Sequence, residues 1–352
     1  MRRVSLVIFL VCLLTSSVYA ANYTWTGAQG NWEDSTMWSN STPPVAPGAT
    51  NDEYKIGSVT AADVNIGVTA QTVYKGRLRV SGPNEFVGTS PVARIVPGAD
   101  FEVGEFRVGD RGSSALGSVG YVYQTGGTIS LKDLAIGRMA SSGNTDVRGY
   151  YTISGDSVMN VSLSGAETGR LYVGGVTGNE GYNGGVGTFT IEGSGPVISM
   201  KRLYVGASTA TRSGTGTLEY KLGSGVSAID VNTDISLDLA GDNSVANLVV
   251  ALTDEDVPPP IIVLVRNSGV AAVVGTFDSV SGDQNGGRAV ENDIVVLSTP
   301  LGVQYTYHMS YVYNAEASQF NNGNDIALVP EPATVALLGL GALVAVRRPR
   351  KK

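Results

Sequence analysis

One short phrase occurs four times between Phe106 and about Ile229, and this repeat constrains the fold more than any other feature. Each copy opens with an alternating apolar tetrad closed by glycine, and the four tetrads start 28, 37 and 32 residues apart. A polar loop, a second alternating phrase, a turn and a third apolar patch follow each tetrad. The tetrads are Phe106-Arg107-Val108-Gly109, Leu134-Ala135-Ile136-Gly137, Leu171-Tyr172-Val173-Gly174 and Leu203-Tyr204-Val205-Gly206.

The periodicity predicts three short strands in each repeat. Apolar side chains at every second position turn one face of a strand inward, and the glycines mark the bends between strands. A unit of roughly 30 residues cannot bury its own apolar face, whereas stacked copies share one continuous core. We therefore predict an all-β fold, a right-handed parallel β-helix or a related solenoid. A large β-sandwich is the alternative, but the matching order of three phrases in four copies favours the solenoid.

Residues 1–20 have the pattern of a secretory signal peptide. Arg2 and Arg3 precede an apolar stretch from Val4 to Leu14, and Val18-Tyr19-Ala20 forms a small-residue cleavage site. We expect the mature chain to begin at Ala21. The one cysteine, Cys12, would leave with this segment, which excludes disulfides and thiol chemistry from the mature protein.

The charge balance of the expected mature chain is acidic. Lysine and arginine number 24, and aspartate and glutamate number 31. Two basic residues lie in the signal segment and five beyond Val346, which leaves 17 basic against 31 acidic residues, a net charge of about −14. Because nucleic acids and anionic lipids are also negative, we expect no nucleic acid partner.

The first mature segment, residues 21–57, contains all three tryptophans, Trp25, Trp32 and Trp38. With the proline-rich turn that follows, it resembles the start of many autotransporter-passenger-like surface proteins, in which such a segment leads into a solenoid. Large amphipathic rings can cover the exposed backbone at the first coil. Stacking of exposed tryptophans on sugar rings is the alternative, but we favour capping because nothing else in the segment selects a sugar.

Residues 58–252 are expected to form the solenoid repeats, and residues 253–329 a C-terminal β cap. Three acidic residues and three prolines between Asp254 and Pro260 predict a surface loop at the boundary. The cap region also resembles the end of the passenger-like proteins, in the phrases Val274-Gly275-Thr276-Phe277, Tyr305-Thr306-Tyr307 and Asn322 to Leu328. Strands that can pair antiparallel are expected at 261–265, 270–276, 293–297, 304–311 and 325–329.

The final segment, residues 330–352, closely resembles the PEP-CTERM sorting signal. Pro330, Glu331 and Pro332 are followed by an apolar run and then by a basic end. The resemblance implies recognition by an exosortase-type membrane protease, with cleavage and delivery to the cell envelope or extracellular matrix. The basic residues of the end are Arg347, Arg348, Arg350, Lys351 and Lys352.

The apolar run from Ala333 to Val346 has 14 residues, fewer than the ~20 that a comfortable spanning helix needs. The basic end would face the cytoplasm. We therefore expect a transient transmembrane stop-transfer segment rather than a permanent anchor. A buried core helix is disfavoured because the basic residues follow immediately.

The sequence offers few groups for catalysis. His308 is the only histidine, and no Gly-x-Ser-x-Gly elbow marks a nucleophile for it. A polysaccharide lyase or glycoside hydrolase is the serious enzyme alternative, since either needs paired carboxylates or calcium with a basic residue on one face. The candidates are Asp100, Glu102, Glu105, Asp110, Arg107 and Arg111. No acidic pair recurs at matched positions, so we expect no enzyme.

Tyr172 and Tyr204 occupy the same slot of the repeat, the one that points away from the core. Exposed tyrosines on one face could bind exopolysaccharide or another surface protein, whereas ordinary strand propensity explains them more simply. No metal site or cofactor is expected. For calcium, Asn322, Asn324 and Asp325, or Asp254 to Asp256, could supply oxygen ligands, but neither group has the spacing of an EF-hand or of a glycine-aspartate nonapeptide array.

These patterns predict an exported, non-enzymatic β-solenoid with a structural, adhesive or exopolysaccharide-associated role at the cell envelope or in the extracellular matrix. Its expected partner is an exosortase-type membrane protease. The discriminating feature is whether acidic side chains converge on one face.

Overall fold

The computed structural model describes residues 22–39, 52–57, 62–67, 76–83, 91–110, 117–138, 146–162, 169–175, 185–206, 214–223, 225–237, 244–284, 288–317 and 323–330. The expected signal peptide, Arg111, Asn322 and the residues from Glu331 onward lie outside this part of the chain. Within it, no helix is both long and apolar enough to span a membrane.

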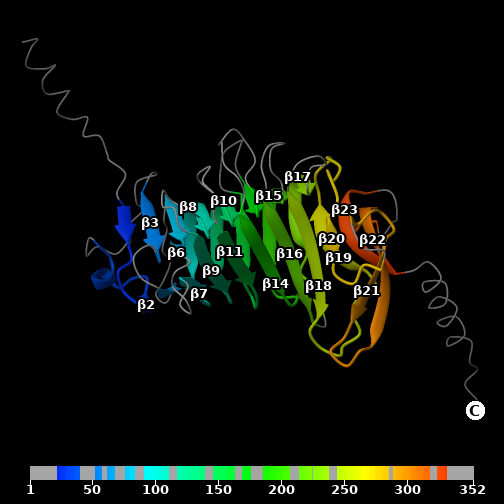
Figure 1. The fold of residues 1–352 in the computed structure, drawn as a ribbon, viewed down its shortest axis with the longest axis horizontal. Coiled ribbons are helices and arrows are strands. Elements are labelled where there is room, and N and C mark those ends of the chain that lie inside the picture. The colour runs from blue at the N-terminus through cyan, green and yellow to red at the C-terminus, as the bar shows by residue number, and fades with distance from the viewer. Residues whose placement is uncertain are drawn as a thin grey trace, which may run out of the picture.

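Two parallel sheets run the length of the molecule (Figure 1). The parallel strands of the first sheet are β1 (Asn22–Thr24), β3 (Glu53–Ile56), β5 (Arg77–Val80), β8 (Asp100–Val108), β10 (Thr128–Ile136), β12 (Val158–Val161), β13 (Arg170–Val173), β15 (Val197–Val205), β17 (Ile229–Leu237) and β19 (Ile262–Asn267). The second sheet contains β2 (Gln29–Asn31), β4 (Asp63–Ile66), β7 (Val92–Ile95), β9 (Ser118–Gln124), β11 (Val147–Ile153), β14 (Val186–Glu192), β16 (Thr215–Leu222), β18 (Val245–Leu252) and β20 (Ser279–Val280). A short strand, β6 (Gly82–Pro83), lies antiparallel to β9.

The strand register places equivalent positions of successive repeats side by side. Leu134 of β10 pairs with Phe106 of β8 and with Leu171 of β13. In the second sheet, Tyr151 pairs with Val122 and Phe189. Since neighbours pair in parallel and in repeat order, the fold is the predicted β-solenoid rather than a sandwich.

The third apolar patch of one repeat and the tetrad of the next join into one bent strand, which differs from the expected three separate strands. In β10, Leu131 and Leu134 are both buried, while Lys132 and Asp133 between them point outward. Two consecutive outward residues break the alternation and turn the chain through a corner without ending the strand. In the next coil the two pieces remain separate, as β12 and β13.

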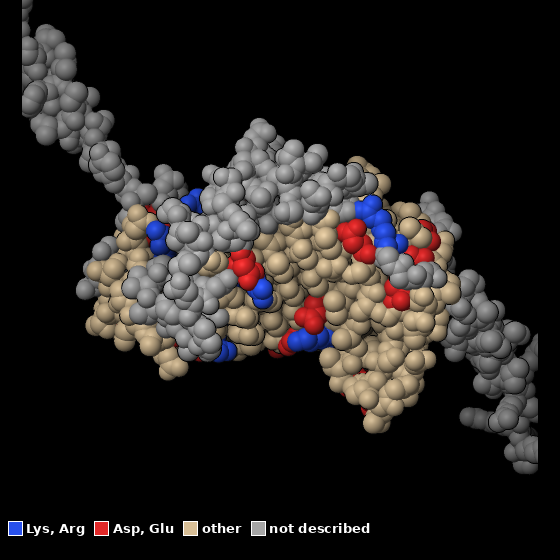
Figure 2. All heavy atoms as spheres, in the orientation of Figure 1, with Lys and Arg blue, Asp and Glu red and all other residues tan. Residues whose placement is uncertain are grey.

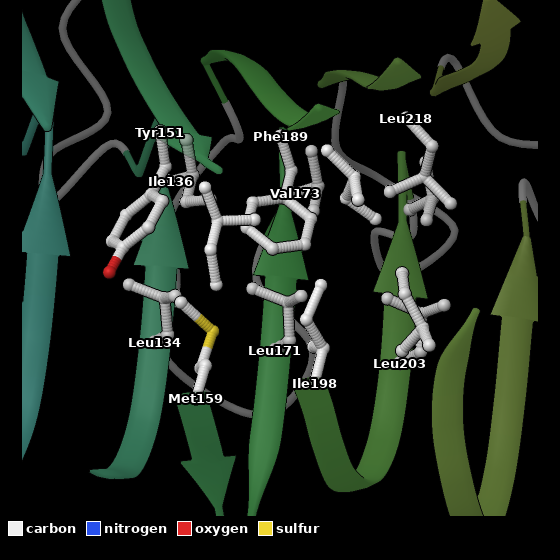
Figure 3. Packing of buried hydrophobic residues seen from close by; sticks show 14 of the residues in the cluster. Leu134, Ile136, Tyr151, Met159, Leu171, Val173, Phe189, Ile198, Leu203 and Leu218 are labelled. Carbon is white, nitrogen blue, oxygen red and sulfur yellow. The ribbon is translucent and has the colours of Figure 1, made fainter. Parts of the chain in front are cut away.

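The core is a continuous column of apolar side chains between the two sheets. Figure 3 shows Tyr151, Phe189 and Leu218 of the second sheet pointing toward Leu134, Leu171 and Leu203 of the first. The column also contains a polar side chain, Gln124, which is fully buried. Its Oε1 accepts a hydrogen bond from the Tyr151 hydroxyl at 2.8 Å, and its Nε2 donates to the carbonyls of Gly127 and Val158.

The glycine that closes each tetrad is required by the approach of the next coil. Its φ lies between +60° and +73° in all four copies, a region that other residues rarely adopt. A Cβ at Gly174 would also meet the backbone carbonyl of Thr215. The same relation holds for Gly109 with Arg148, Gly137 with Val186, and Gly206 with Val245.

The N-terminal segment caps the solenoid, as predicted. Trp25, Trp32 and Trp38 are at most 1% exposed, and the Trp38 Nε1 donates to the carbonyl of Trp32 at 3.0 Å. The 3-10 helix η1 (Ser35–Met37) leads into Trp38. The alternative, sugar stacking on exposed tryptophans, is wrong because the rings are buried against one another and Tyr54. This segment also supplies strands β1 and β2 of the parallel sheets.

The C-terminal cap consists of β21 (Ile294–Ser298), β22 (Gln304–Tyr313) and β23 (Asp325–Pro330), which pair antiparallel. Parallel stacking continues past Leu252 through β19 and β20, so the solenoid extends beyond the expected boundary. The strand expected at 270–276 does not form. There the carbonyl of Ala271 accepts bonds from the side chains of Asn267 and Asn324, and only an isolated bridge joins Val274 to Ser236.

Candidate functional site

The sorting motif begins inside the folded cap. Pro330, the first proline of the Pro-Glu-Pro motif, is the last residue of β23 and is buried. It lies opposite Tyr307 of β22, and the preceding Val329 lies opposite His308. On its other edge β23 pairs with β19, the final parallel strand of the first sheet. The described part of the chain therefore ends in a strand that has a neighbour on each side.

β23 is held at its start by a buried carboxylate. Asp325 is 4% exposed; its Oδ1 accepts the backbone N–H of Asn267, and its Oδ2 accepts that of Ala315, each at 2.6 Å. Along the strand, Ile326 and Leu328 pack into the main core, while Ala327 and Val329 pack with Tyr313 in a smaller cluster. Both faces of β23 are thus buried.

The remaining residues of the predicted sorting signal lie outside the described residues. These are Glu331 and Pro332 and the basic residues Arg347, Arg348, Arg350, Lys351 and Lys352.

The predicted tyrosine face is only partly exposed. Tyr172 and Tyr204 pair in register and stack, with ring centroids 5.1 Å apart and planes 12° apart. Both point away from the core, but Tyr172 is only 6% exposed, so its expected exposure is wrong. The physical reason is crowding, since Tyr172 lies between Ala135 and Tyr204 while the Arg170 guanidinium lies 5.6 Å from its ring centroid.

A second pair of outward tyrosines lies on the second sheet. Tyr121 and Tyr150 stack at 4.7 Å between ring centroids, and the Arg94 guanidinium lies 5.3 Å from the ring of Tyr123. In both stacks the rings face each other across the strands. One face of each ring is therefore used between the tyrosines themselves.

Charged side chains form a network over the corner of the first sheet, which we call the corner network. It consists of Glu53 and Lys55 of β3, Arg77 and Arg79 of β5, Glu105 and Arg107 of β8, and Asp110 and Arg138 just beyond β8 and β10. In one slot successive coils alternate in sign, because Glu53 lies opposite Arg77, and Arg77 opposite Glu105. The slot two residues further along is basic throughout, with Lys55 opposite Arg79 and Arg79 opposite Arg107.

Glu105 and Asp110 are the carboxylates at the centre of the corner network. Arg107 bridges them, at 2.7 Å from Glu105 and 3.1 Å from Asp110, and Arg79 lies 3.1 Å from Asp110. Burial opposes ionisation of Glu105, but the hydrogen bond and charge of Arg107, with the charges of Arg77 and Arg138, lower its pKa to about 2. Such a carboxyl stays ionised and is a poor general acid.

The other candidate acids do not join this pair. The Asp110 side chain is fully buried, whereas Asp100 is exposed and Glu102 is a half-buried outward residue of β8.

Figure 2 shows acidic and basic side chains lying next to one another on the face in view. Two such pairs continue the row of the corner network, Asp133 with Arg170 at 2.9 Å and Asp234 with Arg202 at 3.1 Å.

The remaining candidates for chemistry take part in local structure. The Nδ1 of His308 lies 3.0 Å from the carbonyl oxygen of Asn292. Of the predicted calcium ligands, Asp254 accepts the N–H of Asp256, and Asp325 holds two backbone groups as described above. In the part of the chain that the structure describes, no three His, Cys, Asp or Glu side chains gather in a way that could hold a metal ion.

Sequence reasoning missed the corner network. The six candidate catalytic groups included only three members of this network, Glu105, Arg107 and Asp110, because the other members lie on different coils. The signal was present in the sequence: once the tetrads are aligned, Arg77, Glu105 and Asp133 occupy one slot of three successive coils.

Comparison with known proteins identifies the C-terminal segment. No curated protein and no solved structure matches the chain. Residues 328–351 match the family model of the PEP-CTERM protein-sorting motif. This chain therefore carries an exosortase-type sorting signal, which indicates an exported protein sorted to the cell surface.

Proposed function

We propose that this protein is a structural, non-enzymatic component of the cell envelope or extracellular matrix. An elongated β-solenoid is delivered there by an exosortase-type membrane protease acting on residues 330–352. The observation that carries the proposal is the junction at Pro330, where the sorting motif continues directly from the strand that closes the solenoid. The transient membrane segment at 333–346 belongs to the same proposal.

The pairing of outward charged side chains with one another, within and between coils, supports a structural role. In the corner network each carboxylate lies against arginines of its own or neighbouring coils, so the charges bind the coils to one another. Tyr172 with Tyr204 and Tyr121 with Tyr150 likewise stack from coil to coil. A surface built in this way stiffens a rod.

A β-helix polysaccharide lyase or glycoside hydrolase is less well supported by the same residues. A glycosidase needs one carboxyl that is protonated at working pH, beside a second that is ionised. Glu105 has a lowered pKa, and Asp110 is buried beneath Arg79 and Arg107. Neither arrangement provides a proton donor that a polymer could reach.

Adhesion to exopolysaccharide is a second candidate role, and the outward tyrosine stacks favour it. We would replace Tyr172 and Tyr204 by serine and measure retention on the organism's own exopolysaccharide. The matched control replaces Tyr121 and Tyr150, the same kind of stack on the other sheet. A loss confined to the first variant supports a binding face there, and unchanged retention of both removes the role.

Deletion of the segment after Pro332 tests the delivery. We expect the full chain to fractionate with the cell envelope and the shortened chain to be lost from it. Both should show the same far-UV spectrum and thermal transition, because the deletion leaves every described strand intact. Equal envelope retention of the two chains would contradict the proposal.

A further inference from the structure

The sorting motif overlaps the fold. Pro330 belongs both to the motif and to β23, where it is buried opposite Tyr307. β23 lies between two neighbours, β19 and β22, which pair with it antiparallel. Only Glu331 follows before the second proline of the motif.

A protease that recognises a short linear motif needs that segment free on both sides. Substrates of this kind are bound in an extended form through their backbone groups. In β23 the edges are occupied by β19 and β22, and the side chains from Ile326 to Val329 are buried on both faces. The pairing with β22 reaches Pro330 and the pairing with β19 ends at Leu328, so the folded cap occupies both edges of β23 up to Leu328 and one edge of Val329 and Pro330.

We propose that the folded cap withholds the sorting motif, and that β23 must leave the cap sheet before the membrane protease can bind Pro330. This inference rests on the proposed exosortase-type sorting. Processing then proceeds through locally opened molecules, and its rate follows the population in which β23 is undocked. Folding of the cap and removal of the tail compete for the same residues.

Two sites allow the undocking of β23 to be changed in opposite directions. Loss of the Asp325 carboxylate should favour undocking, and a cross-link between the opposite residues His308 and Val329 should prevent it. Cys12 is the only cysteine in the sequence, so an introduced pair has no competing thiol once the signal segment is removed. His308→Cys with Val329→Cys would link β22 to β23, since the two residues face each other. The matched control, Val296→Cys with Thr306→Cys, links β21 to β22 and leaves β23 free.

The experiment uses the full chain, accumulated in cells without the sorting protease, purified oxidised in mild detergent and mixed with solubilised membranes that contain the protease. Tail removal is followed by intact mass. We expect the wild type and the β21–β22 control to be processed alike, and the β22–β23 link to slow processing at least about tenfold until a reductant is added. Asp325→Asn, which weakens two charge-assisted hydrogen bonds to the backbone, should be processed faster, by about tenfold.

The outcomes separate the two ideas. Processing of the linked variant at the wild-type rate would show that β23 need not leave the cap sheet, and it would leave the proposed sorting function in place. Failure of the unlinked wild type to be processed would instead count against exosortase-type sorting, and the inference that β23 must undock would then also be wrong. Restoration by the reductant shows that a linked chain was folded and competent.

Discussion

Asp110 shows how much a single outward carboxylate contributes to this solenoid. Its side chain is fully buried between Arg79 and Arg107. Removing one partner of a buried ion pair leaves the other charges uncompensated, which typically costs about 3–5 kcal/mol. We expect Asp110→Asn to lower the free energy of unfolding by an amount of this order, measured by urea denaturation.

The control for this change is Asp146→Asn. Asp146 pairs with Arg148, but both side chains are about half exposed. Exposed pairs contribute little, so this variant should stay within about 0.5 kcal/mol of the wild type. Equal losses for Asp110→Asn and Asp146→Asn would show that burial of the corner network does not matter.

Glu105 gives the corner network a pH dependence. Because arginines lower its pKa in the folded state from 4.5 to about 2, its stabilising contribution is complete above about pH 4.5. The contribution is lost as the pH falls through the interval from about 4.5 to about 2. We expect the stability difference between the wild type and Glu105→Gln to be constant from about pH 7 to about pH 5 and to shrink below that, measured by urea denaturation at each pH. A difference that persists unchanged to about pH 2 would contradict the assignment.

At the scale of the element, the tetrad glycine is the position with least freedom. Gly174 has a φ of +73°, and a Cβ there would meet the carbonyl of Thr215 in the next coil. Gly193 has a similar φ of +77°, but a Cβ there would have no atom within 4 Å. We expect Gly193→Ala to cost about 1–2 kcal/mol from backbone strain alone, and Gly174→Ala to cost clearly more, measured by thermal unfolding. Similar losses at the two sites would mean that coil-to-coil contact adds nothing.

The repeat made the strands predictable from the sequence, but the contacts between neighbouring coils could not be predicted from it. Alternation identified the inward residues, such as Tyr151 and Phe189, because one strand suffices to define a face. The sequence did not predict the bend at Lys132 and Asp133, since the joining of two apolar patches into one strand depends on the neighbouring coil. The burial of Tyr172 also depends on what lies one coil away.

The cap shows the same limit. The sequence predicted strands at 304–311 and 325–329, and both formed. It also predicted a strand at 270–276, where the backbone is instead bonded by the side chains of Asn267 and Asn324. The composition of Pro330 to Pro332 identified the sorting motif, but only the pairing with Tyr307 shows that the motif enters the sheet.

At the scale of the whole molecule, both ends of the parallel stack are covered. The N-terminal cover is made by the tryptophans and by the pairing of Trp25 with Trp38. Uncovered edge strands pair readily with other chains. Deleting residues 22–39 should therefore produce concentration-dependent assemblies, measured by light scattering after size-exclusion chromatography. A shortened chain that stays monomeric and folded at high concentration would show that this cover is dispensable.

We infer that a stiff β-solenoid reaches the cell surface through its C-terminal sorting signal. The most direct test is the intact mass of the cell-associated chain in cells with and without the sorting protease. We predict that, with the protease, the surface chain has lost residues 1–20 and the segment after the motif, and that without it the segment remains attached. A surface chain that keeps residues 333–352 in both kinds of cell would contradict this inference.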